Sequence, residues 1–268
     1  MPKSVETFRK LHTQFAPLLL PNAWDAGSAR LFETLGAKAI ATTSGGVAWA
    51  LGYRDGAALP IDEVVHAVAR ITRVVKVPVT VDVENGYSHD PRTVAGNVER
   101  LLKLGVAGIN IEDGEDEPEL LSAKIAAIKG MANDARVDLF INARSDVFLR
   151  NLAKDDDLAK ESIRRGLLYK DAGADGIFLP GVHKRNDVAL IVDRVPLPLN
   201  VMAWPGLPAA PELAEWGVRR VSAGTAISQV AWSAAEVTAK NFLETGDSRS
   251  MNESSVSYVQ MQNAFPEN

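Results

Sequence analysis

Acidic residues end two of the apolar runs in this chain. The run VTVDVE contains Asp82 and Glu84, and the run GINIED ends in Glu112 and Asp113. Because side chains alternate along a strand, Asp82 and Glu84 are expected on one face and the valines on the other. Two carboxylates about 4 Å apart repel by about 4 kcal/mol at an effective dielectric constant of about 20. The simplest compensation is a bound cation.

These carboxylates predict a site for Mg²⁺ or Mn²⁺ at Asp82, Glu84 and Glu112. Hard divalent ions prefer oxygen ligands, and the chain has no cysteine that could supply a thiolate to zinc. The alternative is that the acids cap strand ends or pair with basic side chains. A single acidic pair would favour that alternative, whereas acids on two successive runs favour the metal.

Polar residues at three further run ends could bind an anionic substrate. The backbone N–H groups of Ser44-Gly45-Gly46 could approach an anion closely, since two of these residues lack a Cβ, although an ordinary turn is an equal alternative. Arg144 would bind a carboxylate through its planar fork, unless it pairs with one of the nearby acids. Asn200 is a third candidate, although a lone polar strand residue more often makes a structural hydrogen bond.

Eight short β-type runs position these residues, and each is followed by a segment of helical character. The helical segments are amphipathic: residues 61–75 place Val64, Val68 and Ile71 at spacings of three or four. Glycines end several of these segments just before the next run, as in LKLGVAGINI. The eight runs are PLLLPNA, KAIATTS, VPVTVDVE, GINIED, LFINARSD, GIFLP, PLPLNVMA and RRVSAG.

This repetition predicts an α/β fold, a (β/α)8 TIM barrel, formed as a single domain over residues 1–268. The runs are apolar at most positions, as expected for strands covered on both faces. A doubly wound sheet is the second choice. Active sites of barrels lie at the carboxyl ends of the strands, where the acids and Arg144 are predicted to meet. The polar tail from about residue 246 is expected to pack on a partner or to fray.

Composition disfavours several classes of function. The 268 residues carry a formal net charge of -5 and only 6% are aromatic, so no basic surface for nucleic acid is predicted. No stretch approaches the roughly 18 consecutive apolar residues of a membrane span, and the N-terminus lacks the apolar run of a signal peptide. We expect a cytoplasmic protein without nucleic-acid or membrane partners.

Several motifs occur together between residues 15 and 245: PNAWDAGSARLFETLGAKAIATTSGG, GYRDG, VPVTVDVENGYSHDP, GVAGINIEDG, FINARSD, AGADGIFLP and PLNVMAWPG. This set resembles the isocitrate lyase/phosphoenolpyruvate mutase superfamily, and more closely its small phosphonomutase-like branch. The resemblance implies a Mg²⁺-dependent enzyme that cleaves a C–C or P–C bond of a small 2-oxo or 2-hydroxy acid and leaves an enolate. It also implies a dimer or tetramer in which the eighth helix, at residues 226–244, is exchanged between subunits.

The resemblance also implies roles for individual residues. Asp82 would hold the ion, and Glu84 and Glu112 would act through its water ligands. Asp55 of YRDG would approach the same water shell, and the backbone of residues 44–46 would bind the carboxylate or oxo group of the substrate. The candidate catalytic residues are Asp55 and Arg144, and the candidate substrate-binding residues are Ser44, Gly45, Gly46, Arg144 and Asn200.

Three departures from the superfamily pattern restrict the reaction. Lyases of the superfamily carry a Lys-Lys-Cys-Gly-His type of loop after the fourth strand, where this chain has EDGEDEPELL and no cysteine. Glu84 replaces the usual Asp of the second metal position, and Leu179-Pro180 replaces a His of the phosphonomutases. We therefore predict an enzyme that is not a true isocitrate or methylisocitrate lyase. The alternative is a non-catalytic 2-oxo acid-binding or regulatory barrel, and a Schiff-base aldolase is disfavoured because no run ends in Lys.

Overall fold

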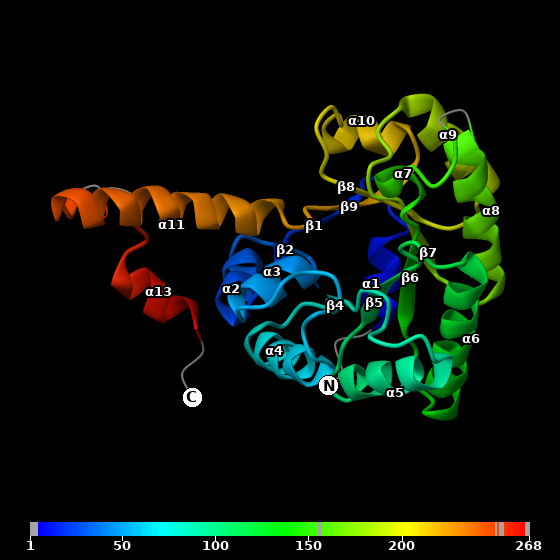
Figure 1. The fold of residues 1–268 in the computed structure, drawn as a ribbon, viewed down its shortest axis with the longest axis horizontal. Helices are drawn as coiled ribbons and strands as arrows, with labels where there is room; N and C mark the ends of the chain where they lie inside the picture. The colour runs from blue at the N-terminus through cyan, green and yellow to red at the C-terminus, as the bar shows by residue number, and fades with distance from the viewer. Residues whose placement is uncertain (1–4, 155–156, 250, 252–254, 266–268) are drawn as a thin grey trace.

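The computed structural model describes residues 5–154, 157–249, 251 and 255–265, and its centre is a barrel of parallel strands (Figure 1). All eight predicted runs contain strands, and the order in the sheet is β1-β9-β8-β7-β6-β5-β4-β3-β2. The strands are β1 (Leu18–Leu20), β2 (Asn22–Ala23), β3 (Ile40–Thr42), β4 (Val79–Asp82), β5 (Gly108–Glu112), β6 (Phe140–Arg144), β7 (Gly176–Phe178), β8 (Leu199–Met202) and β9 (Val218–Ser222).

The first predicted strand is divided into β1 and β2 by Pro21, which has no N–H group to donate to a neighbouring strand. β1 pairs with β9 and β2 pairs with β3, and both pairings are parallel. The two halves of this strand therefore join the two ends of the sheet. The predicted (β/α)8 fold is confirmed, and the doubly wound alternative is wrong.

Helices follow the strands and surround the barrel (Figure 1). In α4, Val64, Val68 and Ile71 are buried, as their spacing predicted. Asp90 caps α5, where its carboxylate accepts a 3.0 Å hydrogen bond from the N–H of Thr93. The helices are α1 (Val5–Leu11), α2 (Ala26–Thr34), α3 (Ser44–Ala50), α4 (Ile61–Val74), α5 (Pro91–Leu102), α6 (Pro118–Asp134), α7 (Val147–Arg150), α8 (Leu158–Asp171), α9 (Arg185–Arg194), α10 (Ala210–Glu215), α11 (Ala226–Thr245) and α13 (Tyr258–Ala264).

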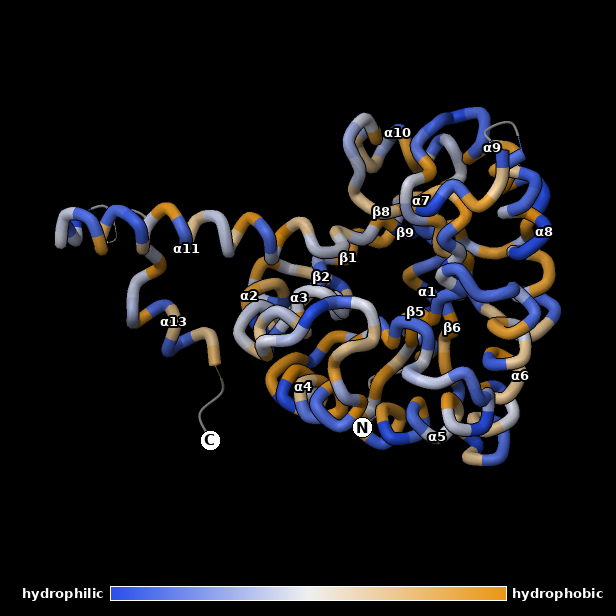
Figure 2. The backbone as a smooth tube through the Cα atoms, viewed as in Figure 1, coloured by the Kyte–Doolittle hydropathy of each residue, from blue (hydrophilic) through white to orange (hydrophobic). Residues whose placement is uncertain are grey.

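Two apolar regions stabilise the barrel. The larger lies between the strands and the helices and contains residues such as Ile109 and Ile141. In the smaller, Phe8 of α1 packs with Leu20 and Phe140, and the two phenyl rings meet edge to face at 5.3 Å. Figure 2 shows hydrophobic residues along the strands, while the outer faces of the surrounding helices are largely hydrophilic. Because Phe140 begins its strand, α1 closes the amino end of the barrel and leaves the carboxyl end accessible.

The last long helix, α11, projects away from the barrel (Figure 1). Its side chains Val230, Val237 and Leu243 are largely exposed. Gly246 ends the helix with a φ of 67°, a left-handed conformation that glycine adopts without strain. The predicted polar tail contains α13, which contacts α2. Among the residues described, no helix has both the length and the apolar character that a membrane span requires.

Candidate active site

A cavity of about 210 Å³ lies among the carboxyl ends of the barrel strands, the end that the sequence predicted for the site. Four of the predicted site residues line it: Ser44, Asp55, Asp82 and Arg144. Much of the remaining wall is apolar or uncharged. The complete lining is Asn22, Thr43, Ser44, Asp55, Asp82, Asn110, Arg144, Leu149, Phe178, Met202, Ser222, Gly224 and Thr225.

Asp82 is the last residue of β4 and bonds to the first residue of α3. Its Oδ2 accepts a 3.0 Å hydrogen bond from the hydroxyl of Ser44, and the backbone N–H of Ser44 points to the same oxygen at 3.5 Å. Burial raises the pKa of Asp82, and the charge of Arg144 opposes that rise. In this structure, Ser44 therefore directs its donors to a carboxylate at the position where the sequence predicted an anion-binding turn.

Gly45 and Gly46 allow α3 to begin directly beside the cavity. A Cβ on Gly45 would lie 3.0 Å from Cγ2 of Thr225 and 3.1 Å from Oδ2 of Asp55, which are both lining residues. A Cβ on Gly46 would lie only 2.6 Å from Cγ2 of Thr43, closer than side chains pack. Gly45 therefore permits the close approach of α3 to the loop that carries Asp55, while Gly46 leaves room for the side chain of Thr43.

Glu84 lies beyond the end of β4, so the period of two does not determine its position. β4 ends at Asp82, and Glu84 has a φ of 49°, in the left-handed region, so the strand alternation stops before it. The Glu84 carboxylate accepts hydrogen bonds from the N–H of Ala57 and, at 3.1 Å, from the hydroxyl of Tyr87. Burial raises the pKa of Glu84. This carboxylate lies beside the cavity, outside its lining, and ties the Asp55 loop to the end of β4.

Arg144 lines the cavity and is also held by two acids. Its Nη1 lies 2.7 Å from Oε2 of Glu112, and its Nε and Nη2 donate to the two oxygens of Asp146 at 2.7 and 3.1 Å. The pairing with a rim acid, which the sequence left as an alternative, is therefore present. Burial raises the pKa of Glu112 to about 8 against the opposing charge of Arg144. Burial lowers the pKa of Arg144, but Glu112, Asp146 and Asp82 together raise it, so the guanidinium stays charged.

A second acid fixes the turn that carries Asp146. Asp113 accepts hydrogen bonds from the hydroxyl of Ser145 at 2.8 Å, the N–H of Asp146 at 2.9 Å and Nη1 of Arg165 at 2.8 Å. The hydroxyl of Tyr169 donates to the same carboxylate at 2.5 Å. The sequence did not single out Asp146, although its place two residues after Arg144 in ARSD was an available signal.

Asn200 lies beneath the cavity and not in its lining. The amide nitrogen of Asn142 donates 3.0 Å hydrogen bonds to Oδ1 of Asn200 and to Oδ1 of Asn110. Arg220, which is fully buried, donates from Nη2 to the same oxygen of Asn110 at 3.0 Å. Of these four, Asn110 reaches the cavity wall. It was missed in the sequence, although it precedes Glu112 by two residues and shares its face of the strand.

A divalent ion at this cavity would depend on the carboxylates that line it or lie beside it. Among the described residues, no group of three or more His, Asp or Glu side chains is arranged so that it could hold a metal ion by itself. Asp55 and Asp82 line the cavity, while Glu84 bonds to Tyr87 and Glu112 pairs with an arginine. Mg²⁺ commonly binds one or two carboxylates and keeps several waters. Burial raises the pKa of Asp82 and Glu84, which means that ionising these carboxylates costs free energy. A nearby cation would offset that cost. The residues fit a largely hydrated ion.

Together these features define a parallel (β/α)8 barrel with a small cavity of acids and one arginine at the carboxyl ends of its strands, as in barrel enzymes. The family model for phosphoenolpyruvate phosphomutase matches residues 8–243. The chain therefore belongs to this family, within the isocitrate lyase/phosphoenolpyruvate mutase superfamily that its motifs resemble. It is an enzyme of the lyase or phosphonomutase-like type.

Individual relatives support the same family. A crystal structure of a candidate phosphonomutase from Burkholderia cenocepacia is 38% identical, covers 89% of this chain and 99% of its own, and superposes with a TM-score of 0.84. An uncharacterized protein of Mycobacterium tuberculosis is 39% identical over 223 residues, 82% of each chain. An oxaloacetate decarboxylase of Paraburkholderia xenovorans is 34% identical over 209 residues, which are 76% of this chain and 69% of that protein.

Proposed function

We propose that this chain is a Mg²⁺-dependent lyase or mutase-type enzyme that cleaves a C–C or P–C bond of a small 2-oxo or 2-hydroxy acid. The observation that carries the proposal is the cavity shared by Asp55, Asp82 and Arg144. Acidic oxygens suit a hydrated cation, and a guanidinium suits a substrate carboxylate. The volume of about 210 Å³ suits an acid of a few carbon atoms. The 34% identity to an oxaloacetate decarboxylase supports the same substrate class.

Asp82 would hold the Mg²⁺ or Mn²⁺ ion directly in this proposal, with Asp55, Glu84 and Glu112 acting through its water ligands. The bound ion would stabilise the negative charge that develops as the substrate forms an enolate. Asp82 is suited to the direct role because it lines the cavity, whereas Glu84 bonds to Ala57 and Tyr87 and Glu112 pairs with Arg144. The hydroxyl of Ser44 orients the Asp82 carboxylate.

Arg144 would bind the substrate carboxylate in the same cavity. Asp146 contacts Nε and Nη2 and Glu112 contacts Nη1, so the plane of the guanidinium is fixed before substrate arrives. The N–H groups of residues 44–46 would receive the oxo or carboxylate oxygen, with the ligand competing with Asp82 for the N–H of Ser44 and with Thr43 for the N–H of Gly46. Asn200 would contribute indirectly, because its Oδ1 accepts a hydrogen bond from Asn142 and so orients that amide beneath the cavity.

The missing thiol restricts the reaction to leaving groups that need no acid from the protein. The chain has no cysteine, and positioned acid–base groups contribute about 10² to 10⁴ in rate. We expect Mg²⁺-dependent turnover of oxaloacetate or another small 2-oxo acid, and negligible release of glyoxylate from isocitrate or of pyruvate from methylisocitrate. Product analysis across this panel is the test. Robust cleavage of either larger acid would contradict the proposal, and oxalate binding without any turnover would favour a binding barrel.

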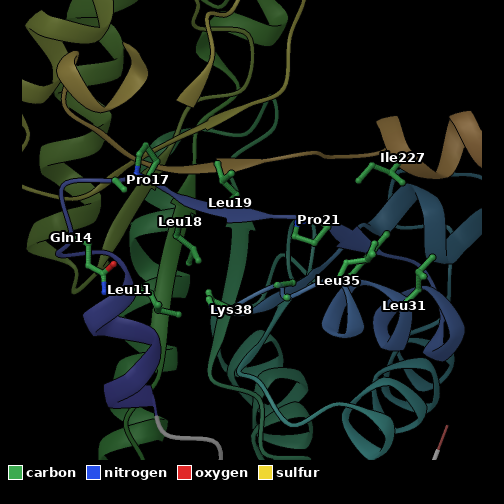
Figure 3. Close-up of a pocket in the computed structure, with 14 residues that line it drawn as sticks. Leu11, Gln14, Pro17, Leu18, Leu19, Pro21, Leu31, Leu35, Lys38 and Ile227 are labelled. Atoms are coloured by element: carbon green, nitrogen blue, oxygen red, sulfur yellow. The ribbon is translucent and has the colours of Figure 1, made fainter. Parts of the chain in front are cut away.

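We also propose that two or more copies of this chain exchange α11. An apolar groove of about 730 Å³ lies beside β1 and α2, where a helix following β9 would complete the barrel. In Figure 3, Leu19 of β1, Leu31 of α2 and Ile227 of α11 lie around this groove. Leu19 is 55% exposed although it belongs to a barrel strand. The exposed apolar residues of α11 from a second copy are suited to cover it.

A further inference from the structure

A layer of polar side chains crosses the inside of the barrel directly beneath the cavity. It contains Asn110, Asn142, Asn200 and Arg220, each at most 4% exposed. In an ordinary barrel the interior is filled by branched apolar residues, so a buried arginine and three amides carry a desolvation cost. Nε and Nη1 of Arg220 have no hydrogen-bond partner among the described residues, which adds to that cost. Stability alone gives no reason for Arg220 at this position.

The hydrogen bonds of this layer fix the orientation of the Asn110 amide. Arg220 can only donate, so the Asn110 atom that lies 3.0 Å from Nη2 must be the oxygen. The same oxygen accepts from the amide nitrogen of Asn142 at 3.0 Å. Oδ1 of Asn110 therefore accepts from both Arg220 and Asn142. The Nδ2 group of Asn110 is left to donate a hydrogen bond into the cavity that this residue lines.

The place of this donor matches the proposed ligand. Asn110 pairs in register with Asp82 across β4 and β5, so its side chain lies next to the carboxylate at the cavity wall. The charge of Arg220 withdraws electron density from the Asn110 oxygen and makes the N–H groups of that amide stronger donors. Arg220 also lies 6.0 Å from the ring centre of Phe8, which packs beneath it and holds it inside the barrel.

We propose that Asn110 is a ligand-binding residue that donates Nδ2–H to an oxygen of the bound acid, and that Arg220 is the positioning residue that fixes and polarises this donor. The inference rests on the proposed function, since the ligand is the same small 2-oxo acid. Asn110 would discriminate by chemistry: it favours a ligand that presents an acceptor oxygen at this point and disfavours one that presents a hydroxyl donor alone.

The test is calorimetric binding of oxalate in the presence of Mg²⁺, on full-length variants whose folding is checked by circular dichroism. Asn110→Ala is expected to weaken binding by about 10- to 150-fold, the range for hydrogen bonds to charged groups. Asn186→Ala, an exposed asparagine of α9, is the matched control and should bind as the parent does. Arg220→Met should weaken binding less than Asn110→Ala. Arg220→Lys, which keeps the charge, should restore part of the affinity and replaces the Met variant if that variant is unfolded.

The double variant separates positioning from a general effect on structure. If Arg220 acts through Asn110, then Asn110→Ala with Arg220→Met binds oxalate no more weakly than Asn110→Ala alone. Multiplied losses in the double variant would overturn the positioning role. Unchanged affinity of Asn110→Ala, in a series where Arg144→Lys loses affinity, would overturn the inference and leave the proposed function standing. Absence of oxalate binding by the parent protein would overturn both.

Discussion

Arg144 combines two tasks in one side chain, because it pairs with acids of the protein and also faces the cavity. Arg144→Lys keeps the charge but removes the fork that Asp146 holds. We expect oxalate affinity, measured by calorimetry with Mg²⁺, to fall by about 1 to 3 kcal/mol, as for the loss of a charge-assisted contact. Arg164→Lys, on the exposed face of α8, is the control. An unchanged affinity in Arg144→Lys would remove this residue from the ligand site.

His12 links pH to stability at the closed end of the barrel. Burial, together with the charge of Arg220, lowers the pKa of His12 from 6.5 to about 3. Below pH 6.5, His12 binds a proton in the unfolded chain but stays neutral in the folded chain. Stability is therefore lost as pH falls from 6.5 toward 3. Between pH 7 and pH 5 this single group should cost about 2 kcal/mol. Urea unfolding at pH 7 and pH 5 measures this loss. The free energy of unfolding should change less between the two pH values in His12→Phe than in the parent, and an equal change in both proteins would contradict the role of His12.

At the scale of elements, Asp113 joins the end of β5 to the turn after β6 and to α8. It pairs with the largely buried Arg165, which without this carboxylate keeps its 2.7 Å pairing to Glu161 but loses the ion pair through Nη1. The buried hydroxyls of Ser145 and Tyr169 lose their acceptor at the same time. Asp113→Ala is expected to lower the free energy of unfolding by about 3 to 5 kcal/mol. Glu119→Ala, which removes an exposed partner of Arg164, should cost at most about 1 kcal/mol. Urea denaturation of both variants measures these free energies of unfolding. A loss for Asp113→Ala as small as that for Glu119→Ala would contradict a stabilising role of the hydrogen bonds around Asp113.

The strands were predictable from the sequence because a parallel barrel covers both faces of every strand and makes each run apolar. Asp82 and Arg144 were predictable because each ends a strand whose carboxyl end meets the others. The turn at Glu84 was not, because its φ of 49° breaks the alternation after β4 and depends on contacts with Ala57 and Tyr87. The orientation of the Asn110 amide was not predictable either, because it depends on Arg220, 110 residues away in sequence, and this contact exists only once the barrel closes.

At the scale of the whole molecule, the exposed helix α11 and the apolar groove beside β1 are two surfaces with matching chemistry. We expect the parent protein to form a dimer or tetramer in light-scattering measurements. Val230→Glu with Val237→Glu places two charges on α11 and should yield smaller species, since charges are costly inside an apolar contact. Glu236→Gln, a polar change on the same helix, should leave the assembly intact. A monomeric parent would contradict the exchange of α11.

In the proposed function, Asp82 holds a divalent ion that an acidic substrate needs for binding. Calorimetry of Mg²⁺ and then of oxalate, on the parent, Asp82→Ala and the exposed control Asp134→Ala, tests this most directly. We expect the parent and the control to bind Mg²⁺ and to bind oxalate only when Mg²⁺ is present. Asp82→Ala should keep its fold by circular dichroism and lose both binding events. Mg²⁺ binding by folded Asp82→Ala as tight as that of the parent would contradict the claim and place the ion elsewhere.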